Sequence, residues 1–167
     1  MPLGEQGYAG LAINTRQHDQ AINTDNFFAV RNDLAAATAV ARALGYQRVV
    51  LRGHSLGTVQ VLYYAATDWS PEFRGVIRWY DEAAATSMEW IRRVPLPLVL
   101  VRDANDQIIL PFELHQLYAA ATAPGALSPA VEIALIPDSH PENGHQFPNT
   151  IPELTEVAVR WLTRLGL

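Results

Sequence analysis

The sequence ALGYQRVVLRGHSLGT, residues 43–58, carries the clearest indication of a fold class. It opens with the end of a helical pattern, and Gly45 stands where a helix-terminating glycine belongs. The apolar run at residues 48–52 predicts a strand, because it is short and is followed at once by Gly53. Helical spacing then returns over residues 56–67. The stretch therefore predicts a strand, a sharp turn and a helix in direct succession, which is typical of a parallel sheet covered by helices.

Alternating strand and helix patterns continue outward from this stretch in both directions. Before it, the spacing of residues 30–44 predicts a helix, and the apolar run at residues 8–14 predicts a strand. After it come strand patterns at residues 73–80, 96–101 and 130–136, and helix patterns at residues 112–123 and 151–165. Residues 81–93 can form at most a short helix over the site. We therefore expect one domain over residues 1–167, with a three-layer α/β/α fold around a mostly parallel sheet of about five strands.

Composition excludes several classes of protein. A chain of 167 residues with 49% hydrophobic and 17% charged residues can bury its own core. The net charge of −5 and the absence of a basic cluster give no reason to expect a nucleic-acid ligand. Without cysteine there is no disulfide, thiolate metal site or cysteine nucleophile. No apolar stretch is long enough to span a membrane and the first residues do not form a secretion signal, so we expect a cytoplasmic protein.

Residues 53–57, GHSLG, form a G-x-S-x-G motif at the turn between the predicted strand and helix. In this context the turn forces Ser55 into a strained backbone conformation that presents its hydroxyl at the carboxyl edge of the sheet. We expect Gly53 and Gly57 to be required, because a Cβ atom at either position would meet neighbouring backbone. The side chain of His54 is expected to point away from Ser55, in a packing or hydrogen-bonding role.

A serine nucleophile needs a histidine base and an acid that orients the histidine. Asp106 follows the fourth predicted strand within DANDQIILP, and His145 follows the fifth within PENGHQF. The order serine, acid, histidine matches that of hydrolases with this motif. Asp103 is an alternative acid, and His140 is an alternative base in the same loop as His145.

These motifs resemble those of the α/β-hydrolase family over about residues 5–165. ALGYQRVVLRGHSLGT is similar to the helix, strand and nucleophile elbow of the family, VLVRDANDQIILP to its acid loop and NGHQF to its histidine loop. The resemblance favours Asp106 and His145 over their neighbours. It implies an esterase that acts on a small-molecule acyl substrate through an acyl-enzyme on Ser55, with the backbone N–H of Leu56 as one oxyanion donor and with no cofactor.

The family has earlier strands that have no counterpart in this sequence. One of them is followed by the loop that supplies a second oxyanion donor. Residues 1–7 are too few for a strand and a helix. We therefore expect the loop near Asn14 and Arg16 to supply that donor and, with His54, to border the substrate. The exposed sheet edge can also pair with a second copy of the chain in a homodimer.

Two other interpretations carry less support from the residues. His140 and His145 lie five positions apart in a loop and, in a chain without cysteine, complete no zinc pattern, so we expect no metal. The alternative function is that of a truncated, non-catalytic binding or interaction domain on the same scaffold, because a fold alone does not secure an activity.

Overall fold

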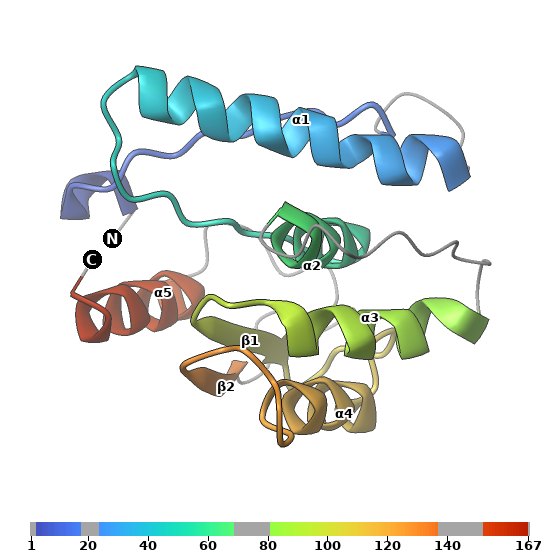
Figure 1. Cartoon of the computed structure of the whole chain (residues 1–167). Coiled ribbons are helices and arrows are strands. Elements are labelled where there is room, and N and C mark those ends of the chain that lie inside the picture. Colours follow the sequence, from blue (N-terminus) through green and yellow to red (C-terminus); the bar gives the residue numbers. More distant parts are fainter. Residues whose placement is uncertain (1–2, 18–23, 69–80, 137–151, 167) are drawn as a thin grey trace. The chain divides into compact units, whose positions relative to one another are not determined.

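The structure is a computed structural model that describes residues 3–17, 24–68, 81–136 and 152–166 (Figure 1). In these residues a short 3-10 helix, five α-helices and two strands follow one another along the chain. Their bounds are η1 Leu3–Gln6, α1 Thr24–Ala43, α2 Leu56–Asp68, α3 Asp81–Arg93, β1 Leu98–Asp103, α4 Pro111–Ala121, β2 Val131–Ile136 and α5 Pro152–Arg164. The described chain is therefore a mixed α/β structure that is mostly helical.

The chain folds into two compact units and passes between them repeatedly. A sheet unit contains η1, β1, β2, α5 and most of α4, whereas a helical unit contains α1, α2 and α3. The sheet unit takes in Met1–Gly10, Pro97–Ala119 and Ala130–Leu167, and the helical unit takes in Leu11–Leu96 and Ala120–Pro129. The expectation of one α/β-hydrolase-like domain over residues 1–167 stays a prediction.

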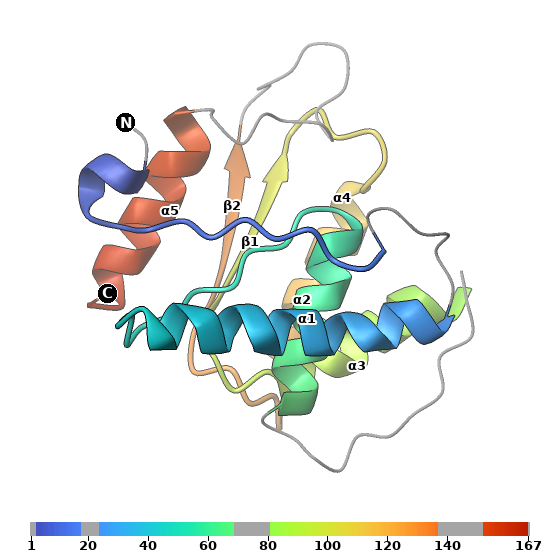
Figure 2. The same cartoon turned by 90° about the horizontal axis from the view of Figure 1, so that it is seen from above.

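In the sheet unit, β1 and β2 form a two-stranded parallel sheet (Figure 2). Their register runs from Leu98 opposite Val131 to Asp103 opposite Ile136. Helix α5 packs against β2 and against η1. Because the strands are parallel and in register, both end at the same edge of the sheet. The predicted acid loop leaves β1 at this edge, and the chain also leaves β2 there.

In the helical unit, α2 packs against α1 and α3 (Figure 1). An aromatic cluster joins the three helices: the ring of Trp90 on α3 is fully buried and lies 4.9 Å from Tyr63 on α2 and 6.2 Å from Phe27 on α1, between ring centroids. Leu51, just before the G-x-S-x-G motif, packs against a second cluster that includes Leu34. These contacts anchor the approach to the motif and the helix after it.

Helix α1 ends as its sequence predicts. Gly45 has a φ of 96°, a left-handed conformation that glycine adopts without steric cost. The N–H of Gly45 donates to the carbonyl of Arg42 at 2.9 Å, and the N–H of Tyr46 donates to that of Ala41 at 3.1 Å. This pair of bonds is a Schellman motif. The start of α1, at Thr24, lies six residues before the predicted start, whereas α2, α4 and α5 agree with their predicted bounds within two residues. Helix α3 extends over all of residues 81–93, where at most a short helix was expected.

The expected three-layer fold around about five strands is wrong for the described residues. The patterns at residues 96–101 and 130–136 correspond to β1 and β2, but residues 8–14 and 48–52 form no ladder. Residues 73–80 lie outside the described residues. An apolar run indicates a preference for burial, whereas a strand also requires a neighbouring backbone at about 4.8 Å. In the two unpaired runs, side chains such as Leu11 and Val50 are about half exposed, at 55% and 47%.

Candidate active site

The G-x-S-x-G turn carries a strained backbone at its serine. Ser55 has a φ of 53°, and no other non-glycine residue in the described part of the chain has a positive φ. The N–H of Gly57 donates to the carbonyl of His54 at 2.8 Å, and that of Thr58 donates to the carbonyl of Ser55 at 2.9 Å. A left-handed conformation costs a residue with a Cβ atom about 1–2 kcal/mol. The turn therefore has the strained conformation that its motif predicts.

The two glycines of the motif differ in their surroundings. A Cβ atom on Gly53 would lie 2.3 Å from the carbonyl oxygen of Gly57 and 2.6 Å from the Cα atom of Thr58, so the backbones approach too closely for any side chain. A Cβ atom on Gly57 would meet nothing within 4 Å. The expectation that Gly57 is sterically required is therefore wrong. Gly57 is the second residue of α2, and its side-chain direction points into open space.

The nucleophile candidate lies at the positive end of a helix. Ser55 and His54 are exposed, and Leu56 is the first residue of α2. The first N–H groups of a helix have no acceptor within the helix, and together they carry about half a positive charge. The backbone N–H of Leu56 thus belongs to a terminus that favours negative charge. An oxyanion that formed next to the hydroxyl of Ser55 would be stabilised there.

The acid candidate belongs to a tightly bonded loop after β1. Asp106 is buried, and its Oδ1 atom accepts hydrogen bonds from the N–H groups of Ile108 at 2.8 Å and Ile109 at 2.9 Å. Asp103, the last residue of β1, is fully buried, and its Oδ1 atom accepts one from the N–H of Asn105 at 2.7 Å. Both carboxylates are thus held by backbone donors of the same loop. The alternative between Asp106 and Asp103 stays open.

Arg102, the penultimate residue of β1, holds this loop and is a residue that the sequence pattern did not single out. Its guanidinium is buried and donates to the carbonyl oxygens of Ala104, Asp106 and Ile109. A signal was available in the sequence: a single arginine ends the apolar run LPLVLV, immediately before the predicted acid loop. A charged side chain at the end of a buried strand is costly without partners, so it indicates a specific role.

The candidate bases lie outside the described residues. His145 and His140 belong to residues 137–151, as do the acidic residues near them. Ser55 belongs to the helical unit and Asp106 to the sheet unit. Within the ranges that the structure describes, no group of three or more histidine, cysteine or acidic side chains could hold a metal ion.

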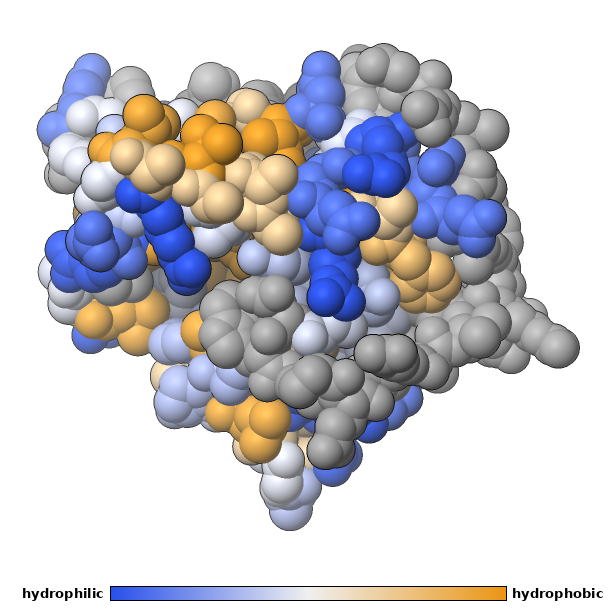
Figure 3. Space-filling model, turned by 45° about the horizontal axis from the view of Figure 1, so that its top comes forward, coloured by the Kyte–Doolittle hydropathy of each residue, from blue (hydrophilic) through white to orange (hydrophobic). Residues whose placement is uncertain are grey.

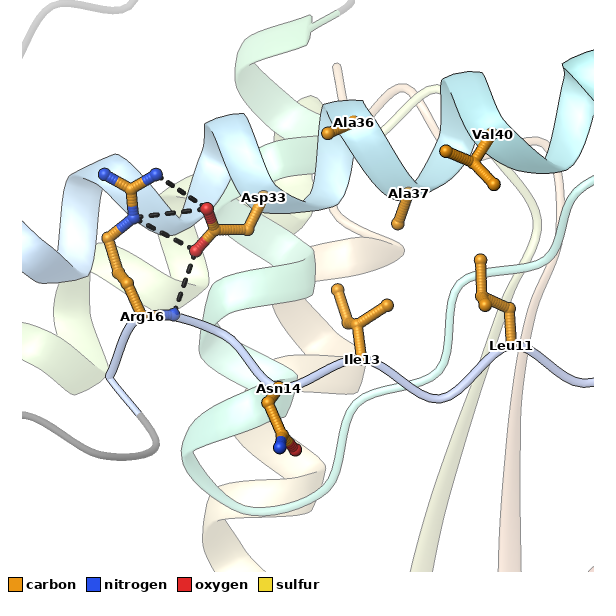
Figure 4. Close-up of a pocket in the computed structure, with 8 residues that line it drawn as sticks. All are labelled: Leu11, Ile13, Asn14, Arg16, Asp33, Ala36, Ala37 and Val40. Carbon is orange, nitrogen blue, oxygen red and sulfur yellow. Dashed lines mark hydrogen bonds and ion pairs between the residues drawn. The ribbon is translucent and has the colours of Figure 1, made fainter.

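Asn14 and Arg16 line a groove between their segment and α1, with a volume of about 490 Å³ (Figure 4). Leu11 and Ile13 point toward α1, whereas the amide of Asn14 points to the other side of the segment. Apolar side chains gather over the C-terminal half of α1 and the adjacent segment (Figure 3). The lining residues are Leu11, Ile13, Asn14, Arg16, Asp33, Ala36, Ala37 and Val40.

One end of the groove is closed by an ion pair between Arg16 and Asp33 of α1. The Nη2 atom of Arg16 lies 2.6 Å from Oδ1 of Asp33, and its Nε and backbone N atoms each lie 3.0 Å from Oδ2. The hydrogen bond from Arg16 lowers the pKa of the Asp33 carboxyl, and the same bond raises the pKa of Arg16. The guanidinium therefore ties the segment to α1.

This pair predicts a pH-dependent contribution to stability. The pKa of Asp33 is lower in the folded chain than in the unfolded chain, so its contribution is complete above the unfolded value of about 3.9 and is lost as the pH falls through the folded value. We expect Asp33→Asn to lower the Tm by a few degrees at most at pH 7, since both side chains are partly exposed to solvent. Thermal melts from about pH 6 to about pH 2.5 should show this difference shrinking. A difference that grows on acidification would contradict the assignment.

Comparisons of the chain with protein-family models, with curated proteins and with solved structures found no match. In the parts of the chain with a described structure, no helix is long and apolar enough to cross a membrane.

Proposed function

We propose that the chain is a serine hydrolase that cleaves a carboxylic ester or a related acyl bond through an acyl-enzyme on Ser55. The observation that supports this most is the strained φ of 53° at Ser55, in a turn where Gly53 packs directly on the backbone of Gly57. Such strain costs about 1–3 kcal/mol and persists where the surrounding structure enforces it, as it does at active sites. An incidental serine in a glycine-rich turn would not need this conformation.

In the proposed reaction, His145 accepts the hydroxyl proton of Ser55 while the Oγ atom attacks the carbonyl carbon of the ester. The oxyanion of the tetrahedral intermediate accepts a hydrogen bond from the N–H of Leu56. The C–O bond to the alcohol then breaks, and His145 returns the proton to the leaving alkoxide. Water repeats the sequence on the acyl-enzyme and releases the carboxylic acid, while Asp106 orients the imidazole and stabilises its charged form.

Asn14 is the better of the two candidates for a second oxyanion donor, because Arg16 is engaged by Asp33. Gln17, at the end of the same segment, accepts a hydrogen bond at 2.5 Å from the side chain of Gln60 on α2, the helix that Ser55 precedes. The segment is thus tied to the nucleophile helix. Loss of an oxyanion donor lowers kcat about 100- to 1,000-fold in known hydrolases.

A fluorophosphonate probe tests the proposal directly, because it phosphonylates only an activated serine. We expect the folded protein to be labelled, and fragmentation of the tryptic peptide 53–74 to place the label on Ser55 and not on Ser70. Ser55→Ala should remain unlabelled, whereas the matched control Ser128→Ala, whose hydroxyl donates to the carbonyl of Leu96, should be labelled normally. A folded wild-type protein that takes up no label would end the proposal.

The second candidate is a non-catalytic binding or interaction domain. One observation favours it: Leu11 and Val40 are 55% and 50% exposed and line the same groove beside α1, and an exposed apolar patch can mark an interaction site. It predicts an unreactive Ser55 and association with a partner, for which we propose a second copy of this chain. Light scattering on the purified protein distinguishes a dimer from a monomer.

A further inference from the structure

The buried side chain of Arg102, the penultimate residue of β1, donates three hydrogen bonds to the loop that follows it. Its side chain is only 5% exposed. Its Nε atom donates to the carbonyl of Ile109 at 2.8 Å, its Nη2 atom to that of Asp106 at 2.6 Å, and its Nη1 atom to that of Ala104 at 3.3 Å. All three acceptors are main-chain oxygens of the loop that follows Arg102 itself.

Within the described residues, no ion pair with a carboxylate accounts for the burial of this charge. Among the ion pairs of the described residues, none involves Arg102. A buried cation without an anionic partner is costly, and here the compensation comes from three charge-assisted hydrogen bonds to carbonyl oxygens. The contacts therefore hold the loop, since they neutralise no acid and bind no other element.

The loop held in this way fixes Asp106 at two points. Its backbone oxygen accepts from Arg102, and its Oδ1 atom accepts from the N–H groups of Ile108 and Ile109. Ile109 is bonded to both residues, because its carbonyl accepts a hydrogen bond from Arg102 while its N–H donates one to Asp106. A rotation of the Asp106 side chain would break the two bonds to its Oδ1 atom, and a shift of the Asp106 backbone would break the bond from Arg102.

We propose that Arg102 is a positioning residue, whose guanidinium holds the carboxylate of Asp106 in the orientation that the catalytic histidine requires. The inference rests on the proposed function and on Asp106 as its acid. Lysine cannot replace this role: its ammonium is a single point, whereas the planar guanidinium directs donors to three oxygens in fixed directions. A displacement of about 1 Å in a catalytic constellation can lower a rate about 100-fold.

The conservative variant Arg102→Lys tests the role in the enzyme. We expect kcat to fall about 10- to 100-fold with little change in KM, because the acid does not touch the substrate. The acidic limb of the pH profile of kcat/KM should move to lower pH, since an imidazolium that loses its carboxylate partner has a lower pKa. Arg160→Lys, at an exposed position of α5, is the matched control and should change none of these values.

A double-mutant cycle separates positioning from a general structural role. If Arg102 acts only through Asp106, then Arg102→Lys should lower kcat in the wild-type background and should lower it no further in an Asp106→Ala background. An equal loss in both backgrounds would overturn the inference, as would an unchanged kcat in the single variant.

Amide hydrogen exchange gives a readout that does not depend on activity. Arg102→Lys should speed exchange at Ile108 and Ile109, whose N–H groups bond to Asp106, while the amides of β2 keep their protection. Unchanged exchange at these two residues overturns the inference and leaves the proposed function intact. A folded but inactive wild-type protein overturns the proposed function and this inference with it. If Arg102→Lys fails to fold, Arg102 is required for folding, and this result would also overturn the positioning role.

Discussion

Gly53→Ala is expected to abolish labelling of Ser55 and to destabilise the protein strongly. The new methyl group would lie 2.3 Å from the carbonyl oxygen of Gly57 and 2.5 Å from its carbonyl carbon. Both atoms belong to the backbone of the first turn of α2, so no flexible side chain can move aside. We expect a loss of about 3 kcal/mol or more in the free energy of unfolding, in the range of severe overpacking. Urea denaturation and probe labelling measure the two effects.

Gly57→Ala is the matched control, because it adds the same methyl group four residues later, where nothing lies within 4 Å. Alanine is favoured over glycine within a helix by about 0.5–1 kcal/mol, so this variant should be slightly more stable than the wild type. Labelling of Ser55 should persist. Similar losses in both variants would show that the close contact at Gly53 does not shape the turn.

His145→Ala is expected to lower kcat about a million-fold, to a level close to that of Ser55→Ala. Without the imidazole the hydroxyl of Ser55 keeps its proton at neutral pH and is a weak nucleophile. Because Ser55 and His145 act as one unit, the double variant should have a kcat no lower than that of either single variant. Steady-state hydrolysis of nitrophenyl esters measures the loss, and circular dichroism checks that the variants fold.

His140→Ala is the control for the base, since His140 lies in the same predicted loop. It should keep kcat within about threefold of the wild type, as a loop substitution away from the chemistry does. Full activity in His145→Ala together with its loss in His140→Ala would transfer the role of base to His140.

The helices follow closely from the sequence. The apolar spacing that predicts them requires only that one face meets the rest of the protein, and their ends depend on local bonds, as at Gly45. The start of α1 was placed too late because its first turn, Thr24 to Asn26, is polar. Phe27 and Phe28, which follow it, pack against the ring of Tyr63 on α2, a contact that spacing within one helix does not reveal.

Some features of the candidate site could also be predicted from the sequence, and others could not. The strained turn at Ser55 could be predicted, because a G-x-S-x-G motif between a strand pattern and a helix constrains five consecutive residues. The pairing of Arg16 with Asp33 could not, since a loop arginine has no sequence signal for a partner 17 residues away. The bonds of Arg102 to three carbonyls also depend on the path of the loop, which residue types alone do not specify.

The amino-acid sequence by itself determined the helices, the glycine that ends α1 and the backbone strain at Ser55, because each depends on atoms a few residues apart. Only the tertiary structure decided which apolar runs became strands. Residues 98–103 and 131–136 pair as parallel strands. Residues 8–14 and 48–52 have a similar apolar pattern but form no ladder in the described structure. Hydrogen bonds between strands join residues distant in the chain, so the pattern of a single run cannot specify them.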